Sequence, residues 1–242
     1  MEIRNVWSVA SKDFEIYRRK KSIIYTMIIL PLSISALFSL YVQQNAAAVV
    51  TTSYSLGLEA ITFTSVILAA ILPGSIAGYS IVGEKVEKSF EPLLSTPLTD
   101  NEILLGKCVA AFLPPILAVW AGATIFMGVT DFSTRSELSF YYFPNANSGI
   151  ILLLLAPLAA IFSIEITTIA SSRLSDVRSA NQIGGLMFIP FMIVFVEGIT
   201  GSFTFDPTNL LILSVVLLIA DIALFFLSTS TFKREKILTQ WK

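Results

Sequence analysis

Six long apolar runs limit what this chain can fold into. An α-helix needs about 20 apolar residues to cross a hydrocarbon core of about 30 Å, and runs of that order recur along the whole chain. Charged residues make up only 14% of the sequence, whereas soluble domains carry about 25%. We therefore expect an all-α, polytopic membrane protein that forms a single transmembrane domain over residues 1–242. The six expected spans are Ile23–Val42, Ala60–Val82, Ile103–Val129, Gly149–Ala170, Ile183–Ile199 and Leu210–Phe232.

The basic residues fall on one side of the membrane if six spans alternate. Of the 16 Lys and Arg residues, only Arg135 falls on the other side. The positive-inside rule then predicts a multi-pass protein of the cell membrane with both termini in the cytoplasm. The formal net charge of −1 gives no reason to expect a nucleic-acid partner.

Residues 3–21 have the pattern of an amphipathic helix. Apolar side chains recur at intervals of three and four residues, and polar ones, Lys12 and Asp13 among them, are expected on the opposite face. Four consecutive cations follow, from Arg18 to Lys21. Such a helix is expected to lie in the cytoplasmic interface with its cations near anionic headgroups; a helix packed on another protein is the alternative. The apolar positions are Ile3, Val6, Trp7, Ala10, Phe14 and Tyr17.

The connection from Gly83 to Lys107 carries more local signals than a linker needs. Val86 and Phe90 are four residues apart in a charged, helix-like stretch, and two prolines follow. Thr99 and Glu102 then form a Thr-x-x-Glu capping box that is expected to begin the third span. We expect a short, structured and amphipathic cytoplasmic segment here, over residues 84–100.

Other helix ends have weaker signals. Ser179 to Gln182 could form a second capping box, and Asp206 followed by Pro207 is typical of the start of a helix. Phe140 to Pro144 is a candidate aromatic belt at the outer interface. Prolines within the spans, Pro157 and Pro190 among them, remove backbone hydrogen bonds and can bend helices.

The stretch Gly83–Lys107 resembles the signature of the ATP-binding-cassette (ABC) type-2 permease family. That signature has a Glu-rich turn after the second span, then Leu-Glu-x-Leu-Leu-x-Thr-Pro, Glu-Ile and a Gly-Lys that opens the third span. This chain has Lys88-Ser89-Phe90 where the family often has Gly-Thr-Leu. The family's six-helix topology with cytoplasmic ends covers the whole chain. The matching positions are Glu84, Glu87, Glu91, Leu93, Leu94, Thr96, Pro97, Glu102, Ile103, Gly106 and Lys107.

The resemblance implies the ABC type-2 exporter fold and the function of a permease subunit. Two such subunits, as a homodimer or a heterodimer, would form a translocation path across the lipid bilayer. Separate nucleotide-binding subunits would supply ATP hydrolysis. The sequence agrees on this last point, because Gly106-Lys107-Cys108 lacks the upstream glycine and the hydroxyl of a P-loop. We expect this chain to bind no cofactor, with ATP and Mg²⁺ held by the partner ATPase.

The resemblance also assigns an ATPase-docking role to residues 84–100, which we call the coupling segment. Apolar anchors would enter a groove of the ATPase while acidic residues set the register at its rim; a loop packed on the permease itself is the alternative. Arg173, Asp176 and Arg178 form a candidate secondary cytoplasmic contact, or else a solvated turn. The candidate docking residues are Glu84, Glu87, Phe90, Glu91, Leu93, Leu94 and Thr96.

Acidic residues within the spans are candidates for the translocation path. A charge near the bilayer centre costs at least ~2.5–3.5 kcal/mol, so such residues usually face the bundle interior or water. Asp221 lies near the middle of the sixth span, and Glu165 lies nearer the inner end of the fourth. They could line a substrate path or a proton site, or they could form an interhelical hydrogen bond or a dimer contact. Glu197 is near the outer end of its span and is more typical of an interfacial residue.

Other function classes are less well supported. The chain has no histidine, which excludes a Ser-His pair and a His-ligated metal site, and Asp221 alone cannot form an intramembrane di-aspartate site. We therefore do not expect an enzyme. A secondary transporter or channel that uses the intramembrane acids is the alternative function. That class predicts a repeat between the two halves, which the sequence does not display, and it gives the coupling segment no role.

Overall fold

The computed structural model describes residues 2–45, 54–86, 98–138, 140–174 and 176–231, and helices dominate these ranges. Six helical segments within them are long and apolar enough to cross a membrane, as the sequence predicts. The helices are α1 (Ile3–Arg19), α2 (Lys21–Gln44), α4 (Tyr54–Val86), α6 (Asp100–Leu138), α7 (Ala146–Ile150), the π-helical turn η1 (Ile151–Leu155), α8 (Ala156–Arg173), α9 (Val177–Leu186), α10 (Ile189–Thr200) and α11 (Pro207–Thr231).

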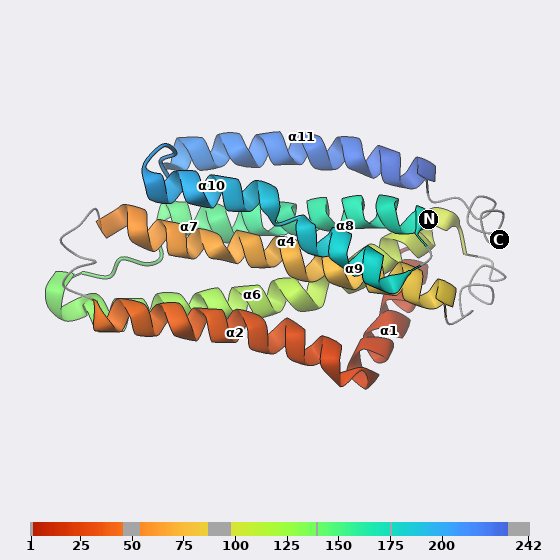
Figure 1. The fold of residues 1–242 in the computed structure, drawn as a ribbon, viewed down its shortest axis with the longest axis horizontal. Coiled ribbons are helices and arrows are strands. Elements are labelled where there is room, and N and C mark those ends of the chain that lie inside the picture. Colours follow the sequence, from red (N-terminus) through yellow and green to blue (C-terminus); the bar gives the residue numbers. More distant parts are fainter. Residues whose placement is uncertain (1, 46–53, 87–97, 139, 175, 232–242) are drawn as a thin grey trace.

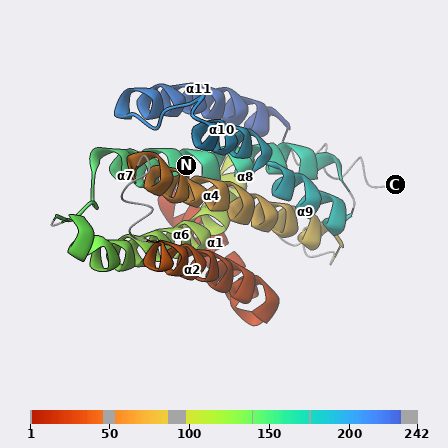
Figure 2. The ribbon, with the colours of Figure 1, turned by 60° about the vertical axis from the view of Figure 1, so that its left-hand side comes forward.

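Helix α4 runs through the middle of the bundle (Figures 1 and 2). Helices α2 and α6 lie on one side of it, and α8 to α11 lie on the other. Within its apolar span, 78% of α4 is buried, against 22% for α2 and for α11. The outer helices therefore carry broad exposed apolar faces, as expected for helices surrounded by lipid. Helix α1, the end of α4, the start of α6 and the end of α11 share one end of the bundle, which we call the basic end.

Small residues allow α4 to approach its neighbours closely. A Cβ added to Gly74 would lie 2.0 Å from the Ser163 Oγ of α8 and 3.2 Å from the Gly184 Cα of α9. A Cβ added to Gly78 would lie 3.0 Å from the backbone of Ala180. Close backbone approach at small residues is a main source of helix association in membranes, where lipid tails are as apolar as leucine. These glycines therefore fix the position of α4 between α8 and α9.

The ends of the helices confirm two predicted start signals and correct a third. The amide of Glu102 donates to Thr99 Oγ1 at 3.4 Å, and the amide of Thr99 donates to Glu102 Oε2 at 2.9 Å, so the predicted capping box is present. Helix α11 begins at Pro207, after Asp206, as predicted. The predicted box at Ser179 is wrong, because Asp176 already caps α9 by accepting from the Ser179 amide at 3.0 Å.

Two of the spans are not continuous α-helices. The expected fifth span consists of α9 and α10, separated by a turn at Met187 and Phe188, with Pro190 in the first turn of α10. In the fourth span the π-helical turn η1 directly precedes the turn that carries Pro157. Proline donates no backbone hydrogen bond and its ring clashes with the carbonyl four residues earlier. Each interruption is where such a clash has to be accommodated.

The predicted aromatic belt is only partly exposed. Helix α6 continues to Leu138, well beyond the expected end of the third span. Phe140 and Tyr141 are exposed, whereas Phe143 is buried. Tyr142 turns inward and its hydroxyl donates to Glu59 at 3.0 Å. Half of the segment thus belongs to the core of the bundle rather than to its surface.

We predict that Gly184→Ala destabilises the protein by about 1–3 kcal/mol, the usual cost of overpacking. The new Cβ would lie 2.5 Å from the backbone of Gly74, so α9 would have to move away from α4. The measurement is the free energy of unfolding in a detergent–SDS titration. Gly185→Ala is the matched control, because a Cβ on this next residue meets nothing within 4 Å. Equal stability of the two variants would contradict the close α4–α9 contact.

Candidate functional site

The predicted ATPase-docking residues lie mostly outside the described part of the chain. Helix α4 continues to Val86, so Glu84 belongs to its last turn, and the described chain resumes just before α6 begins at Asp100. Both flanking helix ends belong to the basic end of the bundle (Figure 1). The coupling segment therefore joins two helices of the central bundle. The residues outside the described ranges are Glu87, Phe90, Glu91, Leu93, Leu94 and Thr96.

The second half of the predicted signature binds α1 to α6. The carboxylate of Glu102 accepts from the backbone amide of Glu2 at 2.8 Å and from Asn5 Nδ2 at 3.3 Å. These donors belong to the N-terminus of α1, where helix amides lack partners within the helix and favour negative charge. One turn later, a Cβ on Gly106 would lie 2.6 Å from the Cβ of Val9. Gly106 thus permits α1 to lie directly on α6.

A buried polar cluster completes this attachment and also includes α4. Lys107 Nζ lies 3.5 Å from Asp13 Oδ2 of α1, and it donates to Ser80 Oγ of α4 at 3.1 Å. Ser80 Oγ in turn donates to Asp13 Oδ2 at 2.7 Å. The Asp13 and Lys107 side chains are 3% and 2% exposed. We call Asp13, Ser80 and Lys107 the α1 anchor, because it joins three helices at the basic end.

The α1 anchor corrects the expected faces of the N-terminal helix. Asp13 was predicted on the polar face, but it points into the bundle because it meets a buried cation there. Ala10 and Tyr17, predicted on the apolar face, are buried on the same side. Ile3 and Trp7 are 83% and 55% exposed. Helix α1 therefore packs on its own chain along one side and presents apolar residues along another.

The candidate secondary contact has one defined structural role. Asp176 caps α9, and the bound Ser179 amide holds the pKa of the Asp176 carboxyl below its usual value. Arg178 is exposed in the first turn of α9. Arg173 is the last residue of α8, and its side chain is not described. The three residues share one short turn at the basic end, with Arg178 available to a partner.

The two candidate acids of the translocation path are both buried. Glu165 and Asp221 are each 5% exposed, and they lie on α8 and α11, which pack against each other. The structure thus brings together two residues that are 56 positions apart. Glu197, by contrast, is exposed on α10.

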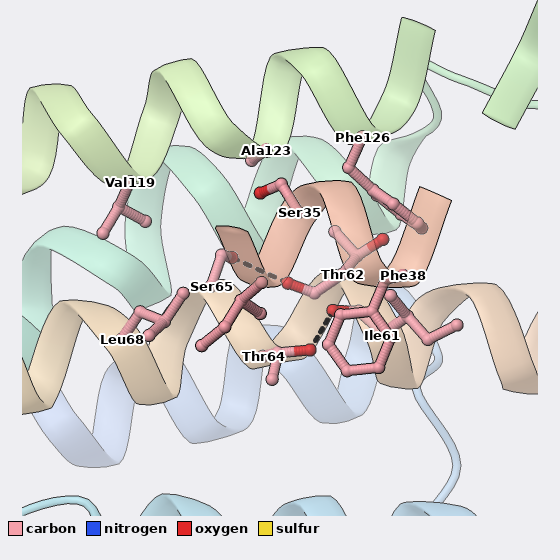
Figure 3. A pocket seen from close by; sticks show the side chains of 11 residues that line it. Ser35, Phe38, Ile61, Thr62, Thr64, Ser65, Leu68, Val119, Ala123 and Phe126 are labelled. Atoms are coloured by element: carbon pink, nitrogen blue, oxygen red, sulfur yellow. Dashed lines mark hydrogen bonds between the residues drawn. The ribbon is translucent and has the colours of Figure 1, made fainter. Parts of the chain in front are cut away.

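A small pocket between α2, α4 and α6 was not predicted (Figure 3). Hydroxyl groups of Ser35, Thr62 and Ser65 contribute to its lining. Its volume of about 20 Å³ has room for a single water molecule. Ser65 Oγ donates to the Thr62 carbonyl at 2.7 Å, and Thr62 Oγ1 donates to the Leu58 carbonyl at 2.8 Å. The Thr62 and Ser65 hydroxyls thus bond to their own helix, and a pocket of this size admits no ligand larger than a water molecule.

We predict that Lys107→Met destabilises the fold by about 3–5 kcal/mol, because it leaves the carboxylate of Asp13 buried without its cation. The double variant with Asp13→Leu should recover much of this loss, since both charges are then removed. Both effects can be measured as free energies of unfolding in a detergent–SDS titration. Lys21→Met removes an exposed cation at the same end and should change stability by less than about 0.5 kcal/mol. A double variant no more stable than Lys107→Met would contradict the pairing.

Comparison with known families identifies the family of the chain. The profile of the family described as ABC-2 family transporter protein matches residues 7–210, more than four fifths of the chain. The matched range includes the α1 anchor, the coupling segment and Glu165. A search of curated proteins gave no match. By its sequence match and its six apolar helices, the chain belongs to the ABC-2 transporter family and is a membrane-spanning permease of an ABC transporter.

Proposed function

We propose that the chain is the permease subunit of an ABC exporter driven by separate nucleotide-binding subunits. The observation that carries this proposal is the α1 anchor beside the coupling segment. The segment connects α4 to α6, and the anchor ties both of these helices to α1 through Asp13, Ser80 and Lys107. A force applied to the segment therefore reaches three helices that are already bonded to one another.

The basic end is the side on which the ATPase would dock. The described cations Arg18 to Lys21, Lys107 and Arg178 belong to this end, and the positive-inside rule favours its placement in the cytoplasm. We assign apolar anchoring to Phe90, Leu93 and Leu94, and a secondary contact to Arg178. Exposed apolar residues of α1, Ile3 and Trp7, are well suited to the adjacent membrane interface.

The translocation path would form between two permease subunits, identical or related. We assign the exposed apolar faces on α2, α10 and α11 to the lipid boundary and to a second subunit. The pair Glu165 and Asp221 supplies the polar part of the path, because both acids are buried and each has a carboxyl oxygen without a hydrogen-bond partner among the described residues. Export is the direction that the family resemblance favours.

We predict that the full chain co-purifies with the ATPase encoded beside it, and that Phe90→Ala, Leu93→Ala and Leu94→Ala together abolish this capture. Removing apolar anchors from a docking segment eliminates the contacts that dominate binding. The measurement is the ratio of ATPase to permease after affinity purification in nanodiscs.

The matched control changes Phe132, Phe140 and Tyr141 to Ala. These exposed aromatic residues lie at the opposite end of the bundle, so the control should retain the ATPase. Equal loss of capture in both triple variants would contradict docking at the coupling segment. Failure of the native chain to retain a folded ATPase would favour the secondary transporter instead.

A further inference from the structure

A groove follows the surface of α8 between α6 and α11. Helix α8 packs against both of these helices, and the groove has a volume of about 300 Å³. Its walls are almost entirely apolar, with Phe112 from α6, Ile161 from α8 and Phe225 from α11. Phe225 and Ile161 remain partly exposed, at 39% and 36%. An apolar molecule of moderate size could enter this groove directly from the hydrocarbon phase.

Glu165 is the only carboxyl among the described residues that line the groove. Glu165 is only 5% exposed, yet its Oε2 has no hydrogen-bond partner in the described structure. Native proteins seldom leave a buried polar atom without a partner. An acid that ends in an apolar groove in this way points to a group that is supplied from outside the chain.

A second unpartnered acid stands beside the first. Both carboxyl oxygens of Asp221 are buried without a hydrogen-bond partner among the described residues, and Asp221 lies on α11, which packs against the helix α8 that carries Glu165. Asp221 precedes Phe225 by four residues, so both lie on the same face of α11. The acid pair therefore adjoins the aromatic wall of the groove.

Lys107, a cation next in sequence to a residue of the groove, already has partners elsewhere. Lys107 precedes Cys108, which lines the groove, but its ammonium group bonds to Asp13 and Ser80 on the opposite side of α6. Two carboxyls at an apolar site are best satisfied by a positive charge, and Phe112 and Phe225 can add cation–π attraction. Beyond the acids, a hydrated metal ion would find only the Cys108 thiol among the described polar groups of these walls, whereas an organic cation with an apolar body would fit them.

We infer that this groove binds a lipophilic organic cation, with Glu165 and Asp221 as its counter-charges. The inference rests on the proposed function for its physiological meaning, since it names the substrate class of the translocation path. Binding itself needs no ATPase, so it can be measured on the permease alone. The cation would enter from the membrane with its aryl or alkyl body against Phe112, Ile161 and Phe225 and its charge toward the acids.

The test measures binding of radiolabelled tetraphenylphosphonium to the full chain, purified in detergent and captured on scintillant beads. We expect saturable binding that unlabelled tetraphenylphosphonium displaces and that triphenylphosphine oxide, a neutral molecule with similar aryl groups, does not. Glu165→Gln and Asp221→Asn should each raise the Kd at least tenfold. Glu197→Gln is the matched control, because it removes an exposed acid of α10, and it should leave the Kd unchanged.

A further variant separates loss of charge from loss of folding. Ile161→Trp fills the groove from its exposed rim with both acids intact, and it should abolish binding while the protein stays monodisperse. Equal affinity for the neutral compound, or an unchanged Kd in the acid variants or in Ile161→Trp, would overturn the inference. Absence of tetraphenylphosphonium binding, as expected if a second copy of the chain covers the groove, would also overturn it. None of these results affects ATPase capture through the coupling segment, so the two proposals fail independently.

Discussion

The backbone of this chain has no water to bond with across the hydrocarbon core, and this constraint governs the whole structure. Each N–H and C=O must find its partner within a helix, which is why the apolar runs become six helical spans. In the described spans, the two interruptions of the α-helix lie next to prolines. The π-helical turn before Pro157 has Ile151 and Leu155 buried against the bundle, and the break before Pro190 lies in a span that packs on α4. Helices α4 and α11 pack against the first irregular turn, whereas the second break is flanked by the exposed residues Leu186 and Ile189.

With the helices fixed, two kinds of contact decide how they assemble. In the apolar interior, Gly74 and Gly184 bring α4 and α9 into backbone contact, since dispersion forces need close approach. At the basic end, assembly depends instead on charge. Lys107 and Asp13 are stable in a buried site because they pair with each other and Ser80 hydrogen-bonds to both, and either one alone would be strongly destabilising. The first contact fixes α4 beside α9, and the second specifies one position for α1.

The sequence predicted features that depend on local spacing. The spans followed from the length of apolar runs, the box of Thr99 and Glu102 from a four-residue motif, and the start of α11 from Asp206 before Pro207. Asp13 was placed on the wrong face, because periodicity assigns polar residues outward and cannot identify a buried partner 94 positions away. Lys107 could have indicated such a partner, because it is a single cation inside the expected third span and needs a counter-charge. The N-cap of α9 was wrongly assigned, because Asp176 and Ser179 are both residue types that cap helices. The groove beside Glu165 could not be predicted, since it exists only where α6, α8 and α11 meet.

Helix α6 places the two proposed sites on its opposite sides. Lys107 bonds to α1 and α4, and the next residue, Cys108, lines the groove beside Glu165. Phe112 continues the groove one turn further, while Gly106 faces α1. A rotation of α6 that draws Lys107 along with α1 must therefore change the width of the groove. A ligand can shift such an equilibrium only by its different affinity for the two positions of α6. In this protein the docking of an ATPase and the binding of a lipophilic cation would both act on α6. This single helix is then sufficient to connect the two sites.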